Sequence, residues 1–141
     1  MRNPWLFTGG ILSAIAALLH LCSIVGGPAW YRFFGAGERL ARLAERKPLT
    51  PALITIAIAG MLILWSAYAL SGAGVVGRLP LTRPALIAIT AIYLLRAAAL
   101  PIMLKTMPDR SEAFLTWSSA IVLAYGVVHV VGLASGWHDL C

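Results

Sequence analysis

The sequence predicts an all-α integral membrane protein, an up-down bundle of four transmembrane helices with an interfacial amphipathic helix in the first loop. Three observations predict this fold class. The 141-residue chain is 60% hydrophobic and 11% charged, with a mean hydropathy of +0.87, which is more apolar surface than one soluble domain can bury. Its apolar residues fall into four blocks of about 20 residues, the length that a helix needs to cross a bilayer. Most charged residues lie between these blocks.

The predicted spans cover approximately residues 5–26, 51–76, 84–104 and 112–135, within one membrane domain of residues 1–141. Each block must be helical, because a bilayer offers no water to satisfy backbone groups. Strands are a poor alternative, since the blocks are too long and do not alternate as a lipid-facing barrel does. The connections after the second and third blocks are short, so consecutive spans should be antiparallel neighbours. A duplicated helical hairpin, indicated by the weak likeness of residues 14–20 to residues 90–96, stays an open alternative.

The first block is expected to remain in the protein as a span. It has a short basic start and an apolar run, but it lacks the small-x-small cleavage site of a signal peptide. His20 and Leu21 precede Cys22, where a lipoprotein signal needs small residues. Cys22 and Cys141 show no metal-binding or redox spacing, so we expect no disulfide framework.

The first loop predicts an amphipathic helix at about residues 33–47. Phe33, Leu40 and Leu43 fall on one side of a helical wheel, and arginines fall on the other. Glu38 and Arg42 have the spacing of a favourable i,i+4 ion pair. We expect this helix to lie on the membrane surface with aromatic side chains at headgroup level. The residues expected to contact anionic lipid headgroups are Trp30, Tyr31, Arg32, Arg39, Arg42, Arg46 and Lys47.

The basic residues also predict orientation. Loops one and three together hold seven Lys and Arg residues, whereas the second loop and the two tails hold three. The positive-inside rule therefore places loops one and three in the cytoplasm and both termini outside. The net charge of +6 is explained by these loops, so we expect an anionic lipid surface as partner and no nucleic acid.

At the start of the fourth span we expect Asp109 to be the helix N-cap. Glu112 stands three residues later and would complete a capping box. Two stripes of small residues are spaced for close helix contact: Gly9–Ser13–Ala17, and Thr116–Ala120–Ala124 with Gly132 and Gly136 further along.

Ionisable and aromatic side chains within the spans are the candidate ligand-binding residues, because polar groups in a membrane are costly and often functional. Two layers are expected. The inner layer holds His20 and Arg96 and can include Tyr93, and the outer layer holds Trp65, Tyr68, Tyr125 and His129. Arg96 has two interpretations: it snorkels to the inner phosphates, or it faces the bundle. Each histidine is expected to be neutral and hydrogen-bonded between helices.

No cofactor and no metal site is expected. The depths of His20 and His129 differ by about 13 Å at the rise of an α-helix, so the two rings cannot ligate one metal or one haem iron. Every acidic residue lies outside the apolar cores, which disfavours proton-coupled carriers that use an embedded carboxylate. No catalytic residues are assigned. A membrane enzyme is not the favoured class, and Tyr125 with His129 is its only credible acid–base pair.

The run LLHLCSIVGGPAWYRFFGAGERLARLAER resembles a segment of small, uncharacterised four-span bacterial membrane proteins, and the similarity covers most of the chain. The resemblance implies a bacterial inner (plasma) membrane protein, with periplasmic termini on the orientation above. It implies no activity, cofactor or site residue.

Two hypotheses on function follow. In the first, the protein is a non-enzymatic accessory or interaction subunit, or a homo-oligomeric bundle, whose small-residue stripes pack on partner helices. In the second, it binds or transports a lipid, a quinone or another amphiphile in an intramembrane pocket around Arg96 and His20.

Overall fold

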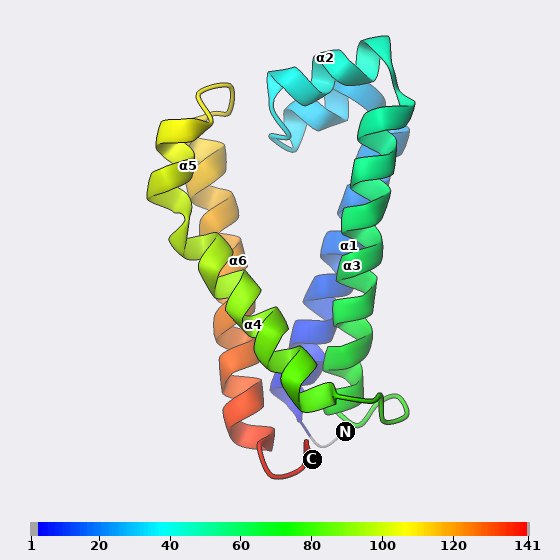
Figure 1. The fold of residues 1–141 in the computed structure, drawn as a ribbon, viewed down its shortest axis with the longest axis vertical. Coiled ribbons are helices and arrows are strands. Elements are labelled where there is room, and N and C mark those ends of the chain that lie inside the picture. Colours follow the sequence, from blue (N-terminus) through cyan, green and yellow to red (C-terminus); the bar gives the residue numbers. More distant parts are fainter. Residues whose placement is uncertain (1–2, 141) are drawn as a thin grey trace.

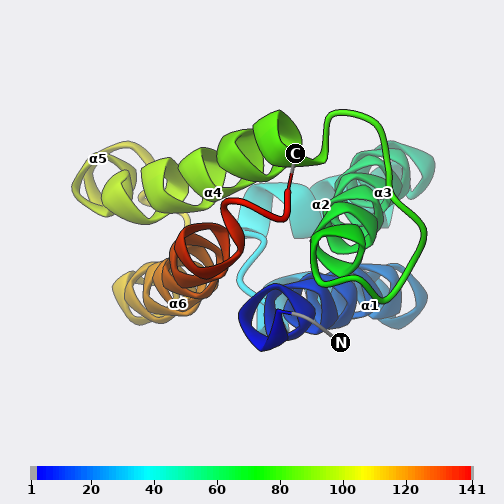
Figure 2. The same cartoon turned by 90° about the horizontal axis from the view of Figure 1, so that it is seen from below.

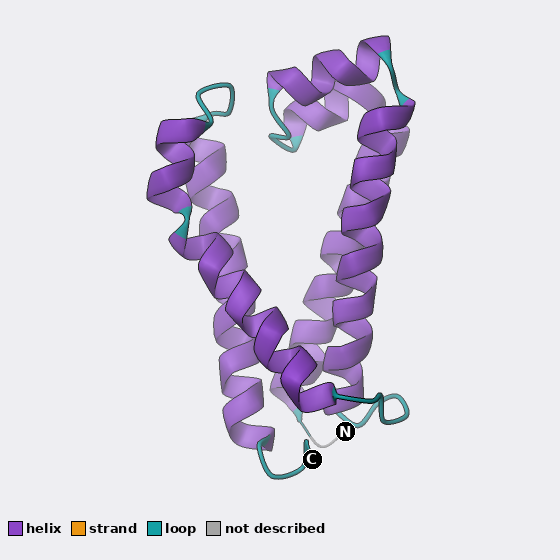
Figure 3. Ribbon diagram, in the orientation of Figure 1, coloured by secondary structure: helices purple, strands orange, loops and turns teal. Residues whose placement is uncertain are grey.

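The computed structural model describes residues 3–140, and these residues form helices and loops without a strand (Figure 3). The predicted all-α class is confirmed. The helices are α1 (Pro4–Phe33), α2 (Glu38–Arg46), α3 (Leu49–Gly72), α4 (Thr82–Ala98), α5 (Leu100–Thr106) and α6 (Glu112–Gly136).

Three of these helices, α1, α3 and α6, are long and apolar enough to cross a membrane. Helices α4 and α5 meet the same criterion only when taken together. The described residues therefore contain three candidate spans, or four if this bent pair is one span. Large apolar side chains on the outer surface are exposed, among them Leu18, Leu64 and Trp117. An outer surface of this kind is expected where helices face lipid rather than water.

The third predicted span is bent rather than continuous. The axes of α4 and α5 differ by 52°, and the break falls at Ala99, just before Pro101. Proline lacks a backbone N–H and its ring clashes with the preceding turn, so a straight helix cannot continue through it.

Helix α1 also contains a break. Gly27 has φ 62° and ψ −151°, and Pro28 follows it. The glycine has no Cβ and tolerates this positive φ, while the proline restarts a helix without needing an N–H partner. Residues 28–33 therefore turn away from the axis of residues 4–26 and lie across the end of the molecule beside α2 (Figure 1).

The long helices form two antiparallel pairs, which we call the first hairpin (α1 and α3) and the second hairpin (α4, α5 and α6). The hairpins converge near the chain termini, the terminal end, and diverge toward α2 and α5, the α2 end (Figure 1). Seen end-on, the four long helices stand at the corners of a quadrilateral (Figure 2). The expected up-down order is therefore present, but the two pairs splay instead of packing evenly along their length.

Close packing joins the hairpins near the terminal end. Gly9, Ser13 and Ala17 are all buried, and Gly132 of α6 lies directly against the buried side chain of Leu6. Asn3 caps α1 by accepting from the Leu6 N–H at 3.1 Å, and its amide also donates to the Gly132 carbonyl at 2.7 Å. The Asn3 side chain thus caps α1 and also hydrogen-bonds α1 to α6.

The expected cap of the last helix is wrong. The N-cap of α6 is Ser111, whose Oγ accepts from the Phe114 N–H at 3.1 Å, and not Asp109. Both residues are good cap formers, and the register of the turn decides between them.

Candidate functional site

Tyr93 of α4 is the centre of a buried aromatic cluster to which four helices contribute. Its ring meets Trp65 of α3 edge-on, with centroids 5.0 Å apart, and it meets Tyr125 and His129 of α6 at 5.6 and 5.2 Å. Its hydroxyl oxygen is 2.8 Å from Ser13 Oγ of α1. The cluster therefore fastens both hairpins together, and it unites Tyr93 with the residues expected in the outer layer rather than with His20 and Arg96.

His129 is completely buried within this cluster. Its Nδ1 lies 2.8 Å from the backbone oxygen of Tyr125, and because a carbonyl only accepts, we assign the proton to Nδ1. Nε2 is then an acceptor, and no donor reaches it among the described residues. The ring is pressed against Gly9, where a Cβ atom would stand 2.7 Å from Cε1.

Tyr125 and His129 both lie in the cluster, but no hydrogen bond joins their two side chains in the described part of the chain. His129 is held by the Tyr125 carbonyl rather than by its hydroxyl. Tyr68 packs against the same core and has no side-chain hydrogen bond in the described part of the chain. The arrangement is that of a packed junction between helices, in which polar edges are mostly satisfied by neighbouring backbone and hydroxyl groups.

Arg96 lies farther along α4, toward the α2 end, and it faces α6. Its Nη1 donates to Ser119 Oγ at 3.1 Å and its Nη2 donates to Ser118 Oγ at 3.3 Å. Both partners are neutral. The two serines were not among the predicted site residues. The sequence could have indicated them, because two adjacent hydroxyl side chains are unusual within an apolar block.

His20 does not join Arg96 in a shared polar contact. Its Nδ1 bonds the Ala16 carbonyl of its own helix at 2.7 Å, and its carbonyl accepts from Ser23 Oγ. The expected inner layer is therefore not assembled by any hydrogen bond of the described residues.

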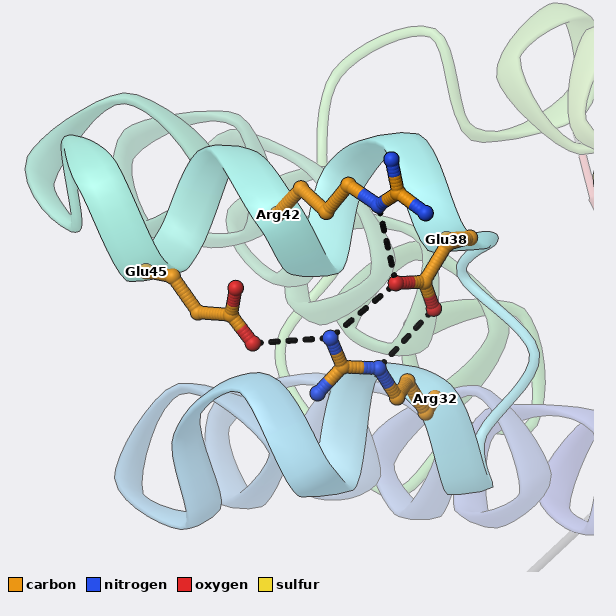
Figure 4. Close-up of polar contacts among 4 residues, drawn as sticks. All are labelled: Arg32, Glu38, Arg42 and Glu45. Atoms are coloured by element: carbon orange, nitrogen blue, oxygen red, sulfur yellow. Dashed lines mark hydrogen bonds and ion pairs between the residues drawn. The ribbon is translucent and has the colours of Figure 1, made fainter.

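At the α2 end, four charged side chains form a network between the end of α1 and helix α2 (Figure 4). Arg32 pairs with Glu38 at 2.9 Å and with Glu45 at 2.7 Å, and the expected Glu38–Arg42 pair is confirmed at 3.1 Å. These hydrogen bonds, first that of Arg32 and then that of Arg42, lower the pKa of the Glu38 carboxyl to about 2. Exposed ion pairs contribute little individually, so the network mainly orients α2.

Helix α2 is amphipathic as expected, but its apolar face packs on protein rather than on lipid. Ala41 and Ala44 are buried against Tyr31, and the Tyr31 hydroxyl oxygen lies 3.3 Å from Thr55 Oγ1 of α3. Tyr31 is thus only 4% exposed, and the structure does not leave it free to contact headgroups.

The remaining expected lipid-contacting residues divide into two groups. Arg32 and Arg42 are exposed but engaged in the network with Glu38 and Glu45. The exposed members outside the network are Trp30, Arg39, Arg46 and Lys47, with the exposed Phe33 beside them. We call Arg39, Arg46 and Lys47, which have no ion pair in the described part of the chain, the α2 basic surface.

A cavity of about 650 Å³ lies at the opposite, terminal end. None of the predicted ligand-binding residues lines it. Its wall includes Asn3, Arg78 and Arg83, and Arg83 donates to the Trp137 carbonyl at 2.7 Å while its guanidinium lies 4.5 Å from the Trp137 ring centroid. Arg78 in the loop before α4 donates to the Asp139 carbonyl at 3.4 Å, so this loop and the first turn of α4 are both bonded to the C-terminal segment.

Among residues 3–140, no three His, Cys, Asp or Glu side chains gather in a group that could hold a metal ion. Comparison of the chain with family models, with curated proteins and with solved structures found no match.

Proposed function

We propose that this chain is a non-enzymatic, multi-pass membrane protein of the bacterial inner membrane that binds anionic lipid headgroups at its α2 end. One observation carries the proposal: the α2 basic surface is exposed on α2 and its C-cap Lys47, and the apolar face of this helix is already covered by protein. Its cations are therefore held at the end of the membrane-crossing helices instead of moving freely on a loop.

The chemistry fits an anionic membrane surface. Cations beside a membrane gain about 1 kcal/mol each from anionic lipids. Trp30 and Phe33 are exposed next to the α2 basic surface and are suited to the boundary between headgroups and acyl chains. On this proposal the α2 end is cytoplasmic, as the positive-inside rule predicts.

Native mass spectrometry of the detergent-extracted protein tests the proposal. With phosphatidylglycerol and phosphatidylcholine supplied in equal amounts, we expect the wild type to retain phosphatidylglycerol preferentially. The triple variant R39Q/R46Q/K47Q should lose most of this preference, because it removes three cations and leaves Arg42 to hold Glu38. The control R39K/R46K should keep it, since binding of this kind depends on charge. Equal retention of both lipids by the wild type would refute the proposal.

A second candidate function, association through α6, is favoured by one observation. Thr116, Ala120 and Ala124 are all exposed, whereas the small residues Gly9, Ser13 and Ala17 are buried inside the fold. Small residues let helices approach closely in a membrane, so this face suits a second copy of the chain. In membranes, A120C should form disulfide-linked dimers, and I121C, about 100° around the helix, should not. Cross-linking of neither, or of both equally, would count against a dimer with this face.

A further inference from the structure

The cavity of about 650 Å³ at the terminal end, which we call the terminal cavity, is built by the ends of four helices. Its wall takes residues from the starts of α1 and α4, from the ends of α3 and α6, and from the segments that follow α3 and α6. Trp5 and Trp137 are both exposed at this end, and tryptophan favours the boundary between membrane and water. On the proposed function, the terminal cavity therefore lies at the outer membrane surface.

The C-terminal part of this wall is packed against the rest of the fold. Leu140 is only 7% exposed, and its Cδ2 lies 3.1 Å from where a Cβ of Gly72 would stand. Arg83 of α4 donates to the Trp137 carbonyl at 2.7 Å, and its guanidinium lies 4.5 Å from the centroid of the Trp137 ring. Apolar packing and a charged hydrogen bond thus give the cavity a defined wall.

The wall contains charges of both signs. Arg78 and Arg83 supply two guanidiniums, and Asp139 supplies a carboxylate. An arginine has five N–H donors, so one that bonds a backbone carbonyl can also donate to a phosphate. Asp139 is exposed and has no ion pair or side-chain hydrogen bond in the described part of the chain. A ligand with an anionic and a cationic group would match this wall better than a ligand with one charge.

Leu81 adds an apolar group to the same wall. It is the N-cap of α4, and its backbone is left-handed, with φ 57° and ψ 29°. This conformation favours glycine or asparagine over leucine. The Leu81 side chain is 76% exposed, so packing inside the chain does not explain an apolar residue here. Contact with an apolar group outside the chain would explain it.

We infer that the terminal cavity binds a phosphate joined to a primary ammonium, with the phosphate at Arg78 and Arg83 and the ammonium at Asp139. Guanidinium forks suit phosphate oxygens, and a carboxylate accepts hydrogen bonds from an ammonium. Ethanolamine phosphate has this chemistry, either as the headgroup of phosphatidylethanolamine or as water-soluble phosphoethanolamine. The inference rests on the proposed function only for the placement in a membrane, since it concerns the opposite end and a different ligand.

Native mass spectrometry of the full chain, supplied with equal amounts of phosphatidylethanolamine and phosphatidylcholine, tests the site. Both lipids carry the phosphate, but only the ethanolamine nitrogen has N–H donors, so the wild type should prefer phosphatidylethanolamine. D139N should bind it about tenfold more weakly, equivalent to one charge-assisted hydrogen bond, and lose the preference. The matched control D109N, which removes a carboxylate near the α2 end, should keep the preference.

The arginines are tested by a different readout. R83Q should weaken the binding of both lipids, because both carry the phosphate. R78Q should act in the same direction, and it reports on the site even if R83Q folds poorly, because residue 78 is exposed in a loop. The triple α2 variant should retain phosphatidylethanolamine as the wild type does.

Phosphoethanolamine added to the protein in phosphatidylcholine nanodiscs identifies the source of the ligand. Asp139-dependent binding of this probe indicates a water-soluble ligand, and its absence with retained preference for phosphatidylethanolamine indicates a lipid. In the lipid case, L81N should weaken retention, because asparagine tolerates the left-handed backbone but removes the apolar contact.

Equal retention of phosphatidylethanolamine and phosphatidylcholine by the wild type, or a D139N variant that behaves as D109N does, would overturn the terminal site. If the triple α2 variant still lost its preference for phosphatidylglycerol in that case, the proposed function would stand alone. An Asp139-dependent preference for phosphatidylethanolamine without any preference for phosphatidylglycerol would instead remove the proposed function and leave the terminal site.

Discussion

Gly9 shows how one residue sets the distance between the two hairpins. It leaves room for the buried His129 ring, and an added Cβ would stand 2.7 Å from Cε1 and 3.0 Å from Nδ1. The ring cannot retreat easily, because Tyr93 contacts it and its Nδ1 is bound to the Tyr125 carbonyl. Close helix approach in membranes commonly depends on small residues placed in this way.

We expect G9A to destabilise the protein by about 1–3 kcal/mol through overpacking against His129. The matched control is G60A in α3, where an added Cβ would meet nothing within 4 Å. G60A should be neutral or slightly stabilising, because alanine favours a helix over glycine. Thermal unfolding in detergent measures the stability of both variants. Equal unfolding midpoints for G9A and G60A would show that the contact between Gly9 and His129 does not restrict the size of the residue at position 9.

At the scale of the element, helix α2 is positioned by charge and packing together. Its nine residues are too few to form a stable isolated helix, so its stability must come from tertiary contacts. Ala41 and Ala44 supply the packing against Tyr31, and Glu38 with Glu45 supplies the link to Arg32. The position of the α2 basic surface therefore depends on this packing and on these ion pairs.

Glu38 provides a pH test of this docking. Its folded-state pKa of about 2 lies below the ordinary value of 4.5, so the ionised carboxylate favours the docked helix above pH 4.5, and this contribution is lost as the pH falls toward 2. Carboxyl-carbon NMR should give a midpoint near 2 for the wild type. In R32Q the midpoint should rise toward the ordinary value, because Arg32 is the largest cause of the shift. An unchanged midpoint in R32Q would show that Arg32 does not hold Glu38.

At the scale of the whole molecule, charge and shape are both asymmetric along the long axis. The hairpins converge at the terminal end and splay at the α2 end, where α2 lies on one hairpin and α5, which contains Lys105, lies on the other (Figure 1). The two arginines at the terminal end, Arg78 and Arg83, donate to backbone carbonyls of the C-terminal segment.

This asymmetry predicts orientation. In a background without Cys22 and Cys141, a membrane-impermeant maleimide added to spheroplasts should label D139C and leave K105C unlabelled until the cells are lysed. Residue 139 is at the terminal end and residue 105 at the α2 end, and both native side chains are exposed. Labelling of K105C alone in intact spheroplasts would reverse the proposed orientation. Cys141 itself lies outside the described residues.

Sequence patterns that extend over a few residues predicted much of the local structure, that is, the helices and the contacts within them. Long apolar blocks indicated helices, and the charge spacing indicated the Glu38–Arg42 pair, because each depends on neighbours within a turn or two. The cap of α6 was misassigned because Asp109 and Ser111 are both competent caps and only the path of the loop chooses between them.

The sequence by itself determined that this chain is apolar, helical and basic at one set of loops, since composition and periodicity are properties of the chain alone. Only the tertiary structure decided which polar groups meet. Tyr93 joins Trp65 and His129, Arg96 turns to Ser118 and Ser119, and Tyr31 is buried under α2. The physical reason is that a side chain's partner depends on the rotation and separation of whole helices, and uniformly apolar helices carry little pattern that sets either one.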